Sequence, residues 1–156
     1  MKKKMNNKGF TLVELIVVLV ILAILAAILV PTLMGYIDKA KQEKDFSTAQ
    51  SVRVAVQSTL AELYSKSDNP NKVSGDKEGD VLGLIGAIKD GNDYKLDGKK
   101  VDVHSVDFAK QYNNTAVDKD MYQLTDITVK IEDSYYTYSS STNTWEASTT
   151  APAAGN

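Results

Sequence analysis

The chain of 156 residues contains no cysteine and only one histidine, His104. The first absence excludes disulfides, thiolate nucleophiles and zinc thiolate clusters. The second excludes a His-rich metal site or a two-histidine relay, which leaves carboxylates, lysine, tyrosine and hydroxyl groups as catalytic candidates. No glycine pattern for binding phosphate is present. We therefore expect a protein that is not an enzyme and has no cofactor.

Positive charge is sparse outside the first nine residues. Lys2, Lys3, Lys4 and Lys8 account for four of the 18 basic side chains, and no acid lies among them. After Gly9 the chain carries 14 basic and 20 acidic side chains, a net charge of −6. Because a negative body repels phosphate backbones, no nucleic-acid partner is predicted.

One long segment is almost free of charge. From Phe10 to Met34 the only charged residue is Glu14, and 25 helical residues span about 37 Å, enough to cross a membrane. Lysines lie close to this segment on its amino-terminal side. The positive-inside rule therefore predicts a single-pass helix with a cytoplasmic leader and an exported carboxyl terminus.

Two ordinary explanations of this segment are less favoured. A secretory signal peptide would have an A-x-A pattern near the carboxyl end of the apolar run, and none is present. A plain membrane anchor would avoid Glu14, because an acid within an apolar helix costs up to about 2.5 to 3.5 kcal/mol at the bilayer centre. The acid makes sense if a partner cation neutralises it in an assembly.

The residues around this acid are Lys8-Gly9-Phe10-Thr11-Leu12-Val13-Glu14-Leu15. They resemble the processing and assembly signature of the type IV pilin family. The resemblance implies that residues 1–9 are a leader removed after Gly9 by a prepilin peptidase, which then methylates the amine of Phe10. It also implies that Glu14 attracts the Phe10 amine of a neighbouring subunit. Removing one partner of such a buried pair costs about 3 to 5 kcal/mol.

Pro31 interrupts the hydrogen bonding of the predicted helix. It lacks an N–H and its ring clashes with the carbonyl of Ala27, so the helix should kink or lose a bond, at about 3 kcal/mol. The resemblance implies local melting of the helix here on assembly. The alternative is a simple kink where the helix leaves the membrane.

The remaining sequence predicts an α+β head in which a long amino-terminal helix packs on a small antiparallel β-sheet, as in the pilin fold. Residues 10–34 form the apolar half of the helix and residues 35–147 the head. Apolar spacing predicts an amphipathic helix over 35–65. We expect a loop at 66–79, a short helix at 80–90 capped by Asp80, about four strands within 94–147, and a flexible tail at 148–156.

Further candidate sites are weaker. Scattered acids such as Asp90, Asp93 and Asp97 could attract calcium, but solvated surface acids are the favoured interpretation, so no metal site is predicted. His104 is expected to be a half-exposed strand or loop residue. Tyr135, Tyr136, Tyr138 and Trp145 could form a sticky aromatic face, although cross-strand packing is favoured. Asn113 begins a possible N-glycosylation motif.

These observations predict the structural subunit of a type IV pilus, a surface filament used for adhesion, twitching motility or aggregation. Its expected partners are copies of itself, minor pilins, the prepilin peptidase, the membrane before assembly and, indirectly, an assembly platform and a cytoplasmic ATPase. The alternatives are a pseudopilin of a type II secretion or DNA-uptake system, and a membrane-anchored binding module acting alone. The absence of cysteine favours a Gram-positive source.

Overall fold

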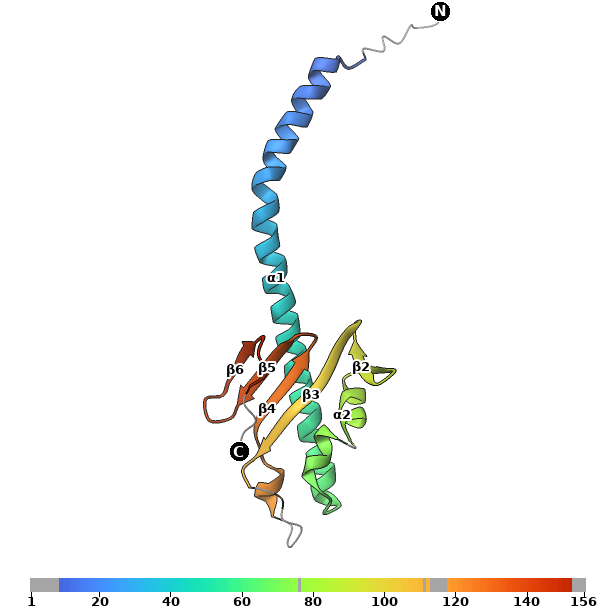
Figure 1. Ribbon diagram of the computed structural model, residues 1–156, viewed down its shortest axis with the longest axis vertical. Helices are drawn as coiled ribbons and strands as arrows, with labels where there is room; N and C mark the ends of the chain where they lie inside the picture. The colour runs from blue at the N-terminus through green and yellow to red at the C-terminus, as the bar shows by residue number, and fades with distance from the viewer. Residues whose placement is uncertain (1–8, 76, 111, 113–117, 153–156) are drawn as a thin grey trace, which may run out of the picture. The chain divides into compact units, whose positions relative to one another are not determined.

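The computed structural model describes residues 9–75, 77–110, 112 and 118–152. The chain forms two compact units, Met1–Gln42 and Glu43–Asn156. The helix α1 (Leu12–Ser65) contributes to both units (Figure 1). It ends at Ser65, as the apolar spacing of the sequence predicts. The two units are described separately below.

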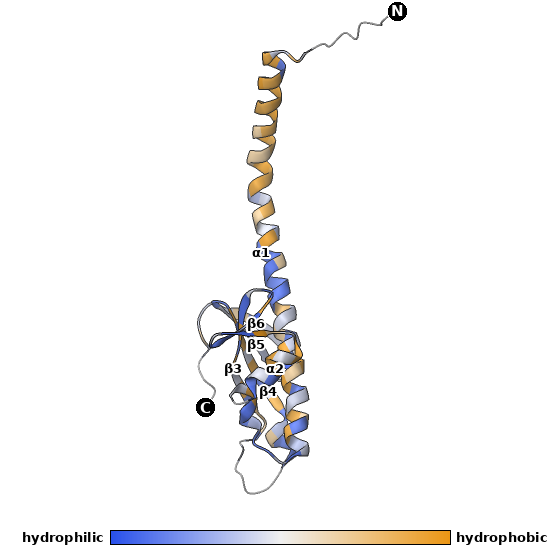
Figure 2. Cartoon of the chain, turned by 90° about the vertical axis from the view of Figure 1, so that its right-hand side faces the viewer, coloured by the Kyte–Doolittle hydropathy of each residue, from blue (hydrophilic) through white to orange (hydrophobic). Residues whose placement is uncertain are grey.

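In the first unit, the described residues from Gly9 to Gln42 are all exposed. Apolar residues follow one another along this part of α1, which is mainly orange in Figure 2, and their large side chains are exposed. Burial of a Val, Leu or Ile side chain stabilises a fold by about 1.5 to 3 kcal/mol. None of this stabilisation is realised within the unit, so its apolar surface requires cover from outside the chain.

The second unit has an α+β architecture. Residues 43–65 of α1 pack one face, Ala49, Val52, Val56, Leu60 and Leu63, into a common buried cluster with the sheet. The sheet has six antiparallel strands in the order β1-β2-β3-β4-β5-β6. They are β1 (Ile88–Asp90), β2 (Asp93–Leu96), β3 (Lys99–Phe108), β4 (Leu124–Ile131), β5 (Ser134–Ser139) and β6 (Thr144–Ser148).

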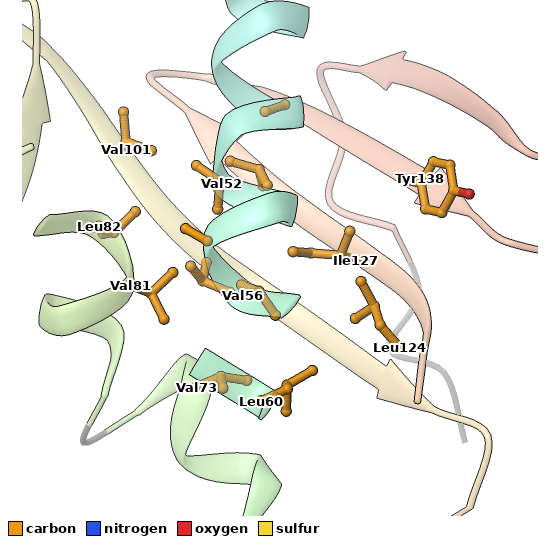
Figure 3. Close-up of a cluster of buried hydrophobic side chains, with 14 of the residues drawn as sticks. Val52, Val56, Leu60, Val73, Val81, Leu82, Val101, Leu124, Ile127 and Tyr138 are labelled. Atoms are coloured by element: carbon orange, nitrogen blue, oxygen red, sulfur yellow. The ribbon is translucent and has the colours of Figure 1, made fainter. Parts of the chain in front are cut away.

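The core lies between α1 and the inner face of this sheet. Alternate strand residues face inward, since Val101 and Val103 of β3 and Ile127 and Val129 of β4 are buried. Figure 3 shows Val52 and Val56 of α1 near side chains from β3, β4 and the short helix α2 (Glu78–Leu84). This packing confirms the predicted fold class of a long amino-terminal helix on an antiparallel sheet.

Several local expectations need correction. The sheet has six strands and not four. The predicted helix over 80–90 is α2, which begins at Glu78 and ends at Leu84, while Ile88 starts β1. Lys77 occupies the N-cap position in place of Asp80, and its side chain makes no capping bond. The expected loop at 66–79 contains a 3₁₀ helix, η1 (Pro70–Ser74), and a second, η2 (Lys119–Tyr122), precedes β4.

The hairpin predicted at Asp97-Gly98 is confirmed. Both residues have positive φ, 51° for Asp97 and 80° for Gly98, and they connect β2 to β3. A two-residue turn of this type matches the right-handed twist of the flanking strands. The turn is also tied to the helix, because the Asp97 carboxylate lies 2.9 Å from the Lys44 ammonium.

Candidate functional site

The first turn of α1 contains the acid singled out by the sequence. The Glu14 carboxylate accepts hydrogen bonds from the Thr11 backbone N–H at 2.9 Å and from the Thr11 hydroxyl at 2.7 Å. In return, the Glu14 backbone N–H donates to the Thr11 hydroxyl oxygen at 3.3 Å. This reciprocal pattern is a capping box, in which Thr11 is the N-cap and Glu14 the third helical residue.

Thr11 is a site residue that the sequence analysis missed. Its signal was available, because Thr followed three residues later by Glu before an apolar run is the sequence pattern of a capping box. The box makes Glu14 part of the reason why the helix begins at Leu12. It supplies the carboxylate with hydrogen bonds, which reduces the cost of burying it, but it supplies no positive charge. Within the described residues, no cation lies within ion-pair distance of Glu14.

The bond between Gly9 and Phe10 lies outside the helix. Both residues are exposed and precede Leu12, and the Phe10 side chain is 88% exposed. A Cβ atom added at Gly9 would meet nothing within 4 Å. An enzyme that cuts after Gly9 would therefore meet an accessible backbone outside the helix. Because Thr11 would remain the second residue of the product, the capping box survives such a cut.

The apolar surface beyond the box is extensive. From Leu12 to Ile37, the large apolar side chains are half exposed or more. In the described part of the chain, α1 is the one helix that is long and apolar enough to cross a membrane. A surface of this kind marks a contact with lipid or with other proteins.

Pro31 lies inside α1, which continues through it. The proline has no N–H for the Ala27 carbonyl. At the next residue, the Thr32 hydroxyl donates to the Ile28 carbonyl at 3.0 Å and lies 3.1 Å from the Leu29 carbonyl. These contacts provide local hydrogen bonding beside the proline. The kink or melting expected at Pro31 stays a prediction.

The other candidate residues have ordinary structural contacts. Tyr136 and Tyr138 are buried against α1, which confirms the packing interpretation for these two. His104 is exposed and packs edge-on against Tyr135, with ring centroids 5.0 Å apart. Asn113 lies outside the described residues, so its proposed glycosylation has no structural description.

The loop acids pair with lysines. Asp90 lies 2.6 Å from Lys95, and Asp93 lies 2.6 Å from Lys100. Across the residues that the structure describes, no group of three or more His, Cys, Asp or Glu side chains is arranged to hold a metal ion.

An uncovered amino-terminal apolar helix joined to an α+β unit is a pilin-like architecture. Consistent with this class, the family model of the prokaryotic N-terminal methylation motif matches residues 4–30. The matched region contains Gly9, Phe10 and Glu14, and it supports a type IV pilin-like family whose members are substrates of prepilin peptidase. No solved structure matches the chain significantly.

Proposed function

We propose that this chain is the repeated structural subunit of a type IV pilus. In this proposal a prepilin peptidase cuts after Gly9 and methylates Phe10, and α1 holds the product in the cytoplasmic membrane with the head outside. An assembly platform and its ATPase then move subunits into an extracellular filament. The filament would serve adhesion, twitching motility or aggregation.

The observation that carries this proposal is the combination of an apolar helix without cover and a carboxylate that has no cation partner among the described residues. Both deficits are met if sister helices surround the segment and the amine of Phe10 from a neighbouring copy approaches Glu14. A buried carboxylate with hydrogen bonds and a cation is far less costly than one with hydrogen bonds alone. Lipid can cover the apolar surface before assembly, but it cannot neutralise the acid.

Mass spectrometry of material sheared from the cell surface tests the processing. The expected species begins at N-methylated Phe10 and is abundant. A product that begins at Met1, or a processed product found only in the membrane fraction, would contradict the proposal.

Two variants test the assembly. Gly9→Ala should block the cut and Glu14→Ala should permit it, yet both should leave subunits in the membrane without filaments. Glu62→Ala is the matched control, because Glu62 is also an exposed acid on α1, and should give normal filaments. Normal filaments from both test variants would favour a membrane-anchored module that acts alone.

A further inference from the structure

The chain has one arginine, Arg53, and its positive charge has no acidic partner. Arg53 lies on α1 within the second compact unit, and its guanidinium carbon is 3.9 Å from the centre of the Tyr138 ring. Among the described residues, no carboxylate lies within ion-pair distance of Arg53. Its Nε atom is buried and has no hydrogen-bond partner. Because arginine is always protonated, the head carries here a charge that the described chain does not neutralise.

The hydrogen-bond acceptors around Arg53 and Tyr138 are already used. The Gln50 side-chain oxygen accepts from the Trp145 indole N–H at 3.0 Å, and the Asn143 side-chain oxygen accepts from the Tyr138 hydroxyl at 2.9 Å. The amide N–H groups of Gln50 and Asn143 make no hydrogen bond within the described part of the chain. A surface that offers donors and a positive charge suits an anion.

The aromatic rings hold the guanidinium in a defined orientation. Tyr138 is buried, and Trp145 packs beside it with ring centroids 5.4 Å apart. A guanidinium that stacks on a ring keeps its edge free, and that edge matches a carboxylate through two parallel hydrogen bonds. Because the side chain is already ordered, binding costs less conformational entropy. Arg53 therefore has the features of a carboxylate-binding group.

A pocket of about 400 Å³ follows on the same flank of α1. Gln57 and Tyr64 line it about one and three helical turns after Arg53, and this spacing keeps them on one face of the helix. The opposite wall includes Lys119 of η2 and Gln123, which follows η2. The volume lies within the usual range for small-molecule sites, roughly 300 to 1,000 Å³.

The lining of this pocket combines an aromatic ring with free polar groups. Tyr64 is 47% exposed, and its ring is fixed edge-on against Tyr122 with centroids 5.2 Å apart. The side chains of Gln57, Gln123 and Lys119 make no hydrogen bond or ion pair with other described residues. A sugar ring meets such a lining on both counts, since its C–H face packs on an aromatic ring and its hydroxyls bind amides.

We propose that this flank of the head binds an acidic oligosaccharide. A sugar ring would lie in the pocket beside Tyr64, and a uronic acid carboxylate would bind the Arg53 guanidinium. A densely charged phosphate polymer is disfavoured, because the chain after Gly9 has a net charge of −6. The inference goes beyond the proposed function, since it concerns the second unit alone and does not depend on how subunits assemble.

Fluorescence titration of the full chain in detergent tests the site. Trp145 is the one tryptophan of the chain and packs on Tyr138, the ring that also contacts Arg53. The probe is tetragalacturonate, and the matched control ligand is its methyl ester, which has the same sugars without the charge. Tetragalacturonate should change the fluorescence saturably, and the methyl ester should bind at least tenfold more weakly.

Two variants test the residues. Arg53→Gln removes the cation, and Gln57→Glu places an acid one turn from Arg53, where it pairs with the guanidinium and repels a carboxylate. Each should weaken binding of tetragalacturonate at least tenfold. Ser58→Glu is the matched control, because it adds the same charge at the next exposed position of α1, which does not line the pocket, and should leave the affinity unchanged. Thermal unfolding of Gln57→Glu should match that of Ser58→Glu, so this pair keeps the test valid even if Arg53→Gln unfolds.

The outcomes separate this site from the proposed function. The site assignment would be overturned by the absence of saturable binding at millimolar tetragalacturonate, by equal binding of the methyl ester, or by full affinity in Gln57→Glu. Equal or tighter binding of tetraglutamate or of oligothymidylate would also overturn it, and would identify an acidic peptide or a phosphate polymer as the ligand. None of these results bears on filament formation, which Gly9→Ala and Glu14→Ala test.

Discussion

The Lys99 ammonium lies 2.5 Å from the Asp45 carboxylate, although 54 residues separate them in sequence. The Tyr136 hydroxyl approaches the same carboxylate at 3.4 Å, and the ring of Tyr136 packs edge-on against Phe46. Burial, followed by the nearby Asp45 carboxylate, raises the pKa of Tyr136. One acid on α1 therefore joins the helix to both β3 and β5.

Asp45→Asn should destabilise the head by about 1 to 3 kcal/mol, because a mostly buried carboxylate loses its ion pair and leaves Lys99 without its partner. Chemical denaturation of the full chain in detergent, followed by Trp145 fluorescence, measures this change. Lys44→Gln is the matched control, since it removes an exposed ion pair with Asp97, which solvent screens, and should cost much less stability than Asp45→Asn. Equal effects of the two variants would contradict the role assigned to Asp45.

The head should lose stability as the pH rises toward neutrality. Burial raises the pKa of Glu78 to about 7, together with a hydrogen bond that the protonated Glu78 carboxyl donates to the Asp102 carboxylate, against the effects of the Val103 N–H and of Lys100. The folded head therefore holds a proton that the unfolded chain releases near pH 4.5. Because the raised pKa belongs to the folded state, the proton contributes stability at low pH that is lost between about pH 4.5 and 7.

Glu78→Gln tests this linkage. The amide keeps a similar shape but cannot ionise, so the melting temperature should become nearly independent of pH across this window and should exceed that of the parent at pH 8. Melting curves at half-unit pH steps provide the measurement. If the stability of the parent protein instead increased from pH 5 to 8, the pH dependence would have the opposite sign. That result would exclude a protonated Glu78 carboxyl beside Asp102 in the folded head.

Replacement of two glycines of α2 by alanine, one at a time, should change the stability of the head in opposite directions. Alanine favours a helix interior over glycine by about 1 kcal/mol. At Gly83 a new Cβ meets nothing within 4 Å, so Gly83→Ala should stabilise the head. At Gly79 the Cβ would collide with the Tyr94 hydroxyl, so Gly79→Ala should destabilise it unless the ring moves. Calorimetric melting temperatures measure both, and adding Tyr94→Phe to Gly79→Ala should restore part of the loss.

Local rules predicted some of these elements well. The apolar period ended the long helix at Ser65, and Asp97-Gly98 located the β2–β3 turn, because both signals are carried by near neighbours in sequence. Strand β1 was missed because its three exposed residues, Ile88–Asp90, show no alternation. The core that α1, α2 and the sheet build together could not be predicted in the same way, because it depends on contacts between segments that are distant in sequence.

The capping box was missed for a different reason. The family resemblance explains Glu14 as half of an intermolecular charge pair, and the spacing of Thr11 and Glu14 was not considered as a cap. The structure indicates that Glu14 serves the helix in every isolated subunit through Thr11. The carboxylate that we propose to pair with a neighbouring copy is therefore already held in a defined position within the single chain.

Thr11→Val should separate these two roles. Loss of the hydroxyl removes two of the three bonds of the box and should weaken the first turn of α1 by about 1 kcal/mol. Amide hydrogen exchange of Glu14 and Leu15 in detergent should accelerate roughly fivefold, because these two N–H groups bond to Thr11, whereas Thr11→Ser should leave it near the parent value. Because Glu14 retains its charge, Thr11→Val should reduce filament yield far less than Glu14→Ala. Equal loss of filaments in these two variants, with exchange unchanged in Thr11→Val, would mean that Thr11 contacts the neighbouring copy directly and does not act by orienting the acid.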